Sequence, residues 1–152
     1  MTVVAGIGAA PAPFCGLART VNGYDPVRAA GLPCAAARST IRAIERGRRG
    51  NWVCSRSVRG TIELDCLNGT RRIEVLERSP VPAVRRPDGS VRLANWLFRI
   101  RARRLEARED GGVRWQRIAG PPWCVPSAPR EALVALRLRP LTAHGGCFSL
   151  RG

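Results

Sequence analysis

The sequence of 152 residues contains no lysine, so its 26 basic residues are all arginine. This absence is typical of a GC-rich genome and by itself indicates no function. Eleven acidic residues leave a formal net charge of +15, and the excess is spread along the chain instead of being confined to one tail. A charge of this size raises the rate of encounter with polyanions such as nucleic acid, anionic lipid or a phosphate-bearing wall polymer.

Histidine is almost absent, and no Cys-x-x-Cys pair occurs. Zinc sites usually contain close cysteine pairs or several histidines, so we expect neither a metal nor another cofactor. The single histidine, His144, lies near Cys147, and this pair would suit catalysis only if Cys147 kept a free thiol. The sequence has no paired acids in a recognisable context and no phosphate-cradling glycine loop. We therefore expect a protein that is not an enzyme.

Long apolar runs are missing too, so we expect no transmembrane span. Residues 1–13, MTVVAGIGAAPAP, are apolar and uncharged but lack the basic start of a complete signal peptide. They fit the end of a signal peptide whose start lies upstream, with cleavage near Ala10 or Ala12. A disordered terminus is the alternative.

The six cysteines predict three disulfides in an oxidising compartment. A strand over residues 52–57 would run back along the preceding helix, which places Cys54 level with Cys66 and far from Cys34. The pairs that this geometry favours are Cys15–Cys34, Cys54–Cys66 and, by elimination, Cys124–Cys147.

Residues 33–47 have the pattern of an amphipathic helix. Pro33 suits the first turn of a helix, because the N–H that proline lacks would have no hydrogen-bond partner there. Gly47 is expected to end the helix. The apolar positions recur at helical spacing and define one face: Cys34, Ala37, Ile41 and Ile44. We expect this face to pack on a core and the arginines to lie on the solvated side.

Residues 61–76 predict a β-hairpin, because two alternating runs flank Asn68-Gly69. The expected cross-strand pairs are Leu67 with Thr70, Asp65 with Arg72, Leu64 with Ile73, Ile62 with Val75 and Glu63 with Glu74. The pair of glutamates calls for a nearby arginine. With strand 52–57, the hairpin would form a three-stranded meander beneath the helix.

The fold class expected is α+β. One helix on an antiparallel meander would occupy residues 14–79, a proline-rich connector residues 80–90, and a second, mainly antiparallel β lobe residues 91–152. Residues 14–26 are expected to form an irregular arm with a turn at Asn22-Gly23. Further strands are expected at residues 132–139 and 147–150.

Residues 91–109 fit two secondary structures. As a strand, one side would carry Trp96, Phe98, Ile100 and Ala102 and the other Leu97, Arg99, Arg101 and Arg103. A bulge near Arg103-Arg104 would keep Leu105 on the apolar side. A helix that starts at Ser90 is the alternative. We favour the strand, because Arg104 interrupts the helical apolar stripe.

Three short segments resemble a known type of domain: residues 31–38 (GLPCAAAR), 51–54 (NWVC) and 66–69 (CLNG). This arrangement of a Cys-x-x-Ala helix start, a Trp-x-Cys strand and a further cysteine before a turn is similar to small domains of exported proteins in high-GC Gram-positive bacteria. The resemblance covers about a third of the chain. It implies an exported domain of uncharacterised role and brings no catalytic residue.

Arg99, Arg101 and Arg103 would project from one side of a strand at intervals of about 6.6 Å. Such a stripe suits a polyanion, and Trp96 and Trp115 could add stacking surfaces, as in single-strand binding grooves. The alternative is an ordinary solvated face with both tryptophans in the core.

A second candidate is the loop at residues 120–126, GPPWCVP, which is too rich in proline for regular structure. Stiffened by proline and anchored by Cys124, this loop could present Pro122, Trp123 and Val125 to a protein partner at low entropic cost. The alternative is a purely structural role, in which the prolines shape the chain around a disulfide-bonded Cys124.

Three functions follow from these features. The first is an exported, non-enzymatic envelope protein that binds an anionic polymer or a protein partner. The second is a secreted inhibitor acting through the loop around Trp123. The third is a cytoplasmic nucleic-acid-binding protein with reduced thiols, which the cysteine pattern disfavours.

Overall fold

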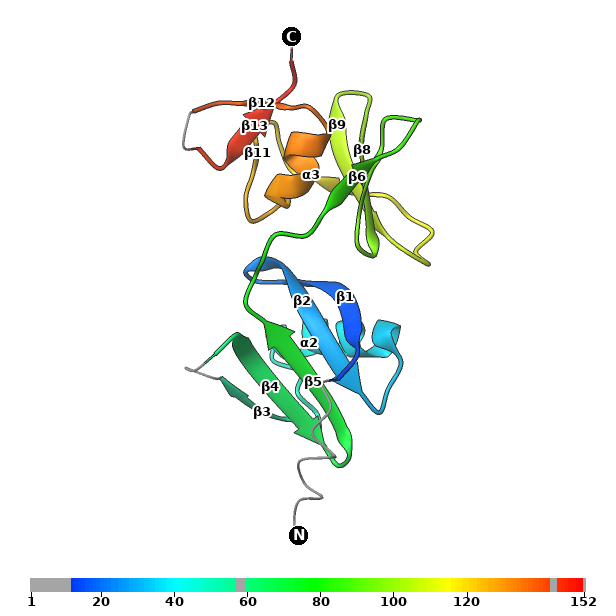
Figure 1. Ribbon diagram of the computed structural model, residues 1–152, viewed down its shortest axis with the longest axis vertical. Helices are drawn as coiled ribbons and strands as arrows, with labels where there is room; N and C mark the ends of the chain where they lie inside the picture. The colour runs from blue at the N-terminus through cyan, green and yellow to red at the C-terminus, as the bar shows by residue number, and fades with distance from the viewer. Residues whose placement is uncertain (1–11, 57–59, 143–144, 152) are drawn as a thin grey trace. The chain divides into compact units, whose positions relative to one another are not determined.

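The computed structural model describes residues 12–56, 60–142 and 145–151. The described chain falls into two compact units (Figure 1). Unit 1 contains the residues up to Thr20 together with Asp25–Arg78, and unit 2 contains Val21–Tyr24 and the chain from Ser79 onward. Within the described residues, no helix has the length and apolar character needed to cross a membrane.

Unit 1 is a five-stranded antiparallel sheet covered by one helix. Its elements are β1 (Phe14–Thr20), β2 (Gly23–Ala30), α2 (Cys34–Glu45), β3 (Val53–Arg56), β4 (Ile62–Asn68) and β5 (Arg71–Leu76). The strand order is β1-β2-β5-β4-β3. The sheet is therefore larger than the expected three-stranded meander, because β1 and β2 also belong to it, and most of these two strands falls in residues 14–26, where the sequence indicated an irregular arm.

The helix α2 begins directly after Pro33, as its spacing predicts, and buries Ala37, Ile41 and Ile44. These side chains share one core cluster with Leu64 and Ile73 of the sheet. Burying an isoleucine side chain contributes about 1.5–3 kcal/mol. Ile41 and Ile44 therefore hold α2 against the sheet of unit 1.

The β4–β5 hairpin forms, but its register differs from the expected one. Asn68 pairs with Arg71, so the loop residues are Gly69 and Thr70 and not Asn68 and Gly69. Gly69 has φ 62° and takes the first loop position, the place of glycine in a type II′ turn. From Leu64 to Asn68 each partner moves by two residues, which leaves these side chains on their expected faces, whereas a register shift between Ile62 and Leu64 pairs Ile62 with Leu76 and not with Val75.

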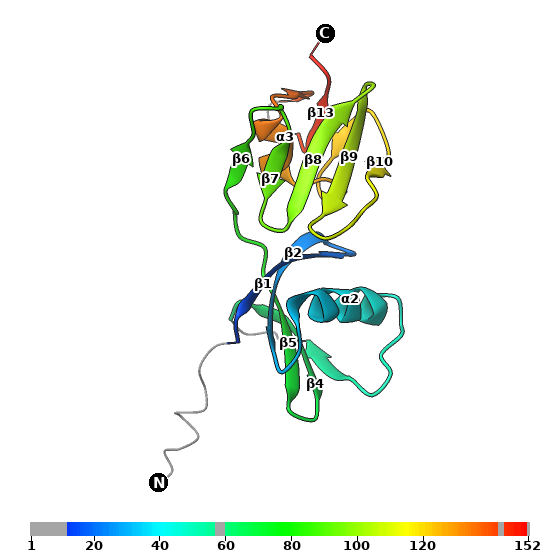
Figure 2. The same ribbon diagram turned by 90° about the vertical axis from the view of Figure 1, so that its right-hand side faces the viewer.

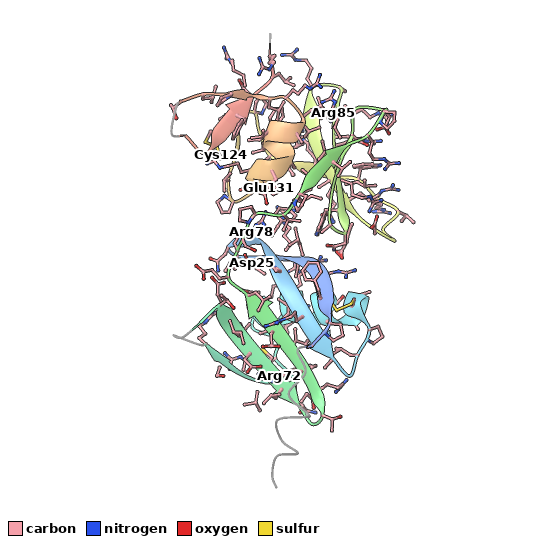
Figure 3. The ribbon with its side chains drawn as sticks, viewed as in Figure 1. Asp25, Arg72, Arg78, Arg85, Cys124 and Glu131 are labelled. Atoms are coloured by element: carbon pink, nitrogen blue, oxygen red, sulfur yellow. A yellow bond between two sulfur atoms is a disulfide. The ribbon has the colours of Figure 1, made fainter. Side chains whose placement is uncertain are left out.

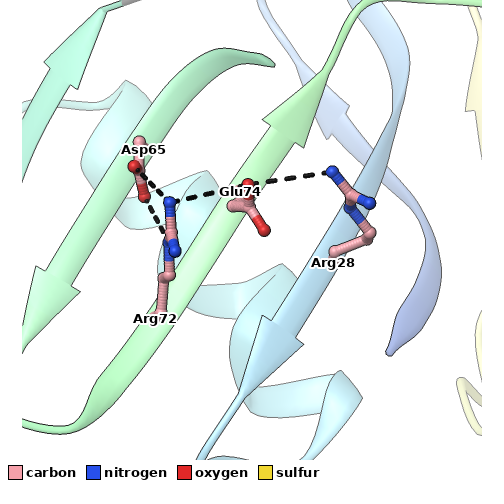
Figure 4. Close-up of polar contacts among 4 residues, drawn as sticks. All are labelled: Arg28, Asp65, Arg72 and Glu74. Carbon is pink, nitrogen blue, oxygen red and sulfur yellow. Dashed lines mark hydrogen bonds and ion pairs between the residues drawn. The ribbon is translucent and has the colours of Figure 1, made fainter. Parts of the chain in front are cut away.

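On the outer face of this hairpin, Asp65 stands opposite Glu74. Arg72 makes two hydrogen bonds to Asp65, at 3.0 and 2.8 Å, and these bonds raise its pKa. Arg72 and Arg28 each approach the Glu74 carboxylate at 3.8 Å from opposite sides (Figure 4). The arginines therefore compensate two acids that would otherwise repel each other across the strands.

Unit 2 contains a second five-stranded antiparallel sheet, in the order β10-β9-β8-β7-β6 (Figure 2). Its strands are β6 (Ala83–Arg85), β7 (Val91–Leu93), β8 (Trp96–Arg101), β9 (Arg104–Glu109) and β10 (Gln116–Ile118). A short helix and a small three-stranded sheet complete the unit: α3 (Arg130–Ala135), β11 (Trp123–Cys124), β12 (Arg139–Pro140) and β13 (Cys147–Ser149). The predominance of antiparallel strands with a helix in each unit is in keeping with the α+β class.

The helix α3 packs against β6 and β7. Glu131 accepts the main-chain N–H of Val81 at 2.9 Å, and Arg85 donates to the carbonyl of Ala135 at 3.2 Å (Figure 3). Residues 132–139 were expected to be a strand that ends before Pro140, but residues 130–135 are helical. Pro129 at the helix start and the buried pair Ala132 and Leu133 favour the helix instead.

Two further expectations for unit 2 need correction. Residues 91–109 are three short strands, and the chain reverses at Ala102 and Arg103, whose φ angles are 51° and 62°. This two-residue turn takes the place of the expected bulge and returns Leu105 to the core. The expected connector, residues 80–90, contains β6, which pairs with β7 as part of the sheet.

All six cysteines form disulfides, in the pairs that the sequence favoured: Cys15–Cys34, Cys54–Cys66 and Cys124–Cys147. In unit 1, Cys54 and Cys66 are direct partners across β3 and β4. In unit 2, Cys124 and Cys147 are partners across β11 and β13. Each unit is therefore cross-linked by its own disulfides, two in unit 1 and one in unit 2.

Candidate anion-binding face

One side of the large sheet of unit 2 carries six arginines. The other side is the core, where Val91, Phe98 and Leu105 are fully buried. Because side chains alternate along a strand and paired residues share a side, the pairs Arg92–Leu97, Arg99–Glu106 and Arg101–Arg104 all point away from that core. We call this surface the arginine face; its members are Arg92, Arg99, Arg101, Arg104, Arg108 and Arg117.

Two acids neutralise only part of the arginine face. Arg99 Nε donates to Glu106 at 2.8 Å, and Arg92 Nη1 donates to Asp110 at 2.6 Å. Within the described part of the chain, the other four arginines of this face form no ion pair. The surface therefore keeps an excess of fixed positive charge.

The excess is densest at the tip of the β8–β9 hairpin. Arg101 stands directly opposite Arg104, and like charges in this relation destabilise a sheet. Arg103 lies between them in the turn, with a left-handed φ that costs a non-glycine residue free energy. The tip thus carries three arginines within four residues, and a bound anion would offset the repulsion between the paired Arg101 and Arg104.

Trp115 supports two members of the arginine face. It precedes β10 and continues its register, so its ring lies on this side of the sheet. The guanidinium of Arg99 lies 3.9 Å from the ring centroid, and that of Arg108 lies 4.9 Å from it. These cation–π contacts hold both side chains in place.

The structure therefore brings together only part of the expected polyanion site. Arg99 and Arg101 lie on one side of β8 as expected, whereas Arg103 belongs to the turn and does not continue the stripe. Trp96 is 2% exposed and lies in the core, so it offers no stacking surface. The sequence analysis missed Arg92, Arg104, Arg108 and Arg117, although the alternation of Arg104, Glu106 and Arg108 could have indicated the second strand.

The expected partner loop does not present its tryptophan. Trp123 is completely buried, and its Nε1 donates to the carbonyl of Ile118 at 3.3 Å. Gly120 makes room for the ring, because a Cβ there would lie 2.8 Å from it. Pro122 and Val125 are exposed, but without Trp123 the loop has no aromatic anchor for a target.

No described cysteine keeps a thiol, since all six are in disulfides. Among the residues whose positions are given, no cluster of three histidine, cysteine or acidic side chains could hold a metal ion. His144, the candidate base beside Cys147, lies outside the described residues. The arginine face, by its charge, is suited to the recognition of anions.

Comparison with protein-family models, with curated proteins and with solved structures finds no match to this chain.

Proposed function

We propose that this chain is an exported, non-enzymatic protein that binds a phosphate-bearing polymer of the cell envelope on its arginine face. The observation that carries this proposal is the hairpin tip, where Arg101, Arg103 and Arg104 follow one another around the turn and none of them forms an ion pair with an acid among the described residues. Guanidinium groups bind phosphate oxygens through paired hydrogen bonds and remain charged at any physiological pH. A polymer with regularly spaced phosphates can contact several of these groups at once.

An extracellular location is supported by the three disulfides, which form and persist in oxidising compartments. Their pairing within each unit gives two small cores the covalent support that proteins outside the cell commonly use. The resemblance of residues 31–38, 51–54 and 66–69 to exported domains points in the same direction.

Nucleic acid is the second candidate, because it carries the same phosphate charge. Nonspecific single-strand binding normally adds aromatic rings on which bases stack. Here Trp96 is buried, and the guanidinium of Arg99 already covers Trp115 at 3.9 Å. The face therefore offers contacts to a charged backbone without an open platform for bases, which favours the envelope polymer.

The experiment is a binding titration with purified poly(glycerol phosphate) over a range of salt concentrations. We expect the affinity to fall steeply as salt rises, because each contact releases counterions. The test variant is Arg104→Gln with Arg117→Gln: both side chains are exposed on the arginine face and have no ion pair among the described residues. Losing two contacts should reduce the slope of log affinity against log salt by about 1 to 2.

The matched control is Arg48→Gln with Arg49→Gln, which removes the same charge from exposed positions of unit 1. An equal loss of affinity in both double variants would show that only net charge matters and would overturn the arginine face as the site. Stronger binding to single-stranded DNA than to poly(glycerol phosphate) at equal salt would favour the nucleic-acid function instead.

A further inference from the structure

A hollow of about 420 Å³ opens beside the hairpin that carries the arginine tip. It forms because β7 is short: its three residues pair only with Trp96–Phe98, so residues 99–101 of β8 have no strand beside them on that edge. The turn between β6 and β7 and the end of α3 close the hollow. Its lining includes Arg85, Asp88, Ser90, Arg99, Arg101 and Leu136.

The cationic part of this hollow is partly fixed before any ligand enters. Arg85 Nη1 donates to the carbonyl of Ala135 at the end of α3, at 3.2 Å. Its other terminal nitrogen lies close to Gly89, where an added Cβ would be 3.7 Å away. Arg85 pairs with the buried Val91, so its guanidinium lies on the α3 side of the sheet, whereas the side chain of Arg101 belongs to the arginine face on the other side. The guanidinium of Arg85 is therefore available to an acidic ligand group in a set orientation.

Asp88 adds a negatively charged hydrogen-bond acceptor to the lining of the hollow. Its Oδ1 accepts the main-chain N–H of Ser90 at 2.9 Å and the hydroxyl of Ser90 at 2.6 Å. These bonds lower the pKa of Asp88, so the carboxylate stays charged. A carboxylate repels a bare oxyanion, but it is a strong acceptor for hydroxyl groups. Oδ2 takes part in neither bond to Ser90 and can receive a hydroxyl of a ligand.

We infer that this hollow binds a single phosphorylated sugar unit, with the phosphate on Arg85 and a sugar hydroxyl on Asp88. The combination of an arginine with an ionised acid fits a ligand that carries both an anion and hydroxyl donors. The volume of 420 Å³ lies within the range of small-molecule sites and exceeds what one oxyanion needs. This inference rests on the proposed function in that it names the unit of polymer that the same edge of the sheet would recognise.

The test compares glucose 1-phosphate, inorganic phosphate and glucose by calorimetric titration of the whole chain. We expect glucose 1-phosphate to bind at least tenfold more tightly than either of the others. Asp88→Asn preserves the turn, because asparagine makes the same local bond, and should reduce this preference about tenfold. Arg85→Gln should weaken glucose 1-phosphate and inorganic phosphate alike.

A further arm separates a free ligand from a unit of a polymer. If glucose 1-phosphate displaces a poly(glucosyl phosphate) chain, the hollow holds a unit of that chain; if it binds without displacement, the hollow serves a free sugar phosphate. Equal affinities for glucose 1-phosphate and inorganic phosphate, unchanged in Asp88→Asn, would overturn the inference. So would an absence of binding.

The two proposals fail in different ways. Arg104→Gln with Arg117→Gln lies outside the hollow and tests the arginine face alone. If the polymer binds normally while glucose 1-phosphate does not, the proposed function stands and the sugar site falls. If glucose 1-phosphate binds but Arg104→Gln with Arg117→Gln does not change polymer affinity, the sugar site is supported and the proposed polymer function is not.

Discussion

Arg38 Nη1 donates a buried 2.7 Å hydrogen bond to the main-chain carbonyl of Cys15. One turn earlier on the same helix, Cys34 forms a disulfide with that Cys15. The helix α2 is thus tied to β1 at two successive turns, once by a covalent bond and once by a charged donor. An arginine-rich composition therefore does not make every arginine a surface charge, and Arg38 is part of the core structure of unit 1.

Arg38→Met should destabilise unit 1 by about 1.5–3 kcal/mol, because methionine keeps much of the aliphatic stem and leaves a buried carbonyl without its charged donor. Hydrogen exchange of the α2 amides measures this loss in unit 1 alone. The exposed Arg46→Met, on the same part of the chain, should change stability by less than about 0.5 kcal/mol. Equal protection of α2 in both variants would contradict the assigned role of Arg38.

Asp25 predicts a pH dependence of stability in unit 1. The side chain is 2% exposed, and burial raises its pKa above 3.8, against the lowering effects of a 2.7 Å hydrogen bond from Thr20 and of the charge on Arg78 (Figure 3). A carboxyl with a raised native pKa favours folding in its protonated form. Its contribution to stability is therefore lost as pH rises from about 3.8 through the native pKa.

Asp25→Asn should be more stable than the parent chain at neutral pH, and the difference between the two should vanish at low pH. Chemical unfolding across this pH range measures both effects. Thr20→Val removes the bond that lowers the pKa, so it should enlarge the pH-dependent loss. A variant Asp25→Asn that is less stable than the parent at neutral pH would show that the charge on Arg78 outweighs burial.

The disulfide between Cys54 and Cys66 closes a short loop at the sheet edge of unit 1, with a sequence separation of 12. In the chain-entropy description a loop of this length contributes about 3 kcal/mol. Cys54→Ala with Cys66→Ala should lower the free energy of unfolding of unit 1 by about that amount. The exchange of the β8 and β9 amides in unit 2 should stay unchanged, and a parallel loss there would mean that the two units do not unfold separately.

The elements with strong periodicity could be predicted from the sequence. Ala37, Ile41 and Ile44 recur at helical spacing, and α2 buries all three. The β4–β5 hairpin also forms, although its loop lies one residue later than Asn68-Gly69 indicated. The side chains from Leu64 to Asn68 still lie on the expected faces of the sheet, because a two-residue shift preserves the alternation of a strand.

The elements that were missed have local features that hide them. Gly16, with φ 83°, and Pro26 interrupt the pattern of β1 and β2, so residues 14–26 do not look like strands. In α3, apolar residues alternate over only a few positions, and so short a helix cannot be distinguished from a strand by period. The candidate site was partly predicted, because Arg99 and Arg101 lie on one strand; its remaining arginines come from strands whose pairing the sequence does not show.

Trp115 provides the sharpest test of how the arginine face is organised. If its ring holds Arg99 and Arg108 in place for a ligand, Trp115→Leu should weaken poly(glycerol phosphate) binding about two- to fivefold, the value of an exposed cation–π contact. Arg99 keeps its 2.8 Å bond to Glu106 in this variant, so the larger change should fall on Arg108. Adding Arg108→Gln to Trp115→Leu should therefore cost less affinity than the same change costs in the parent chain.

The matched control is Trp52→Leu, since Trp52 of unit 1 also lies beneath a guanidinium, that of Arg71, at 5.4 Å. This change removes a comparable cation–π contact away from the arginine face and should leave polymer affinity unaltered. Equal effects of the two tryptophan variants would mean that polymer binding depends on general stability. A loss confined to Trp115→Leu would mean that the positions of the arginines, and not only their number, determine affinity.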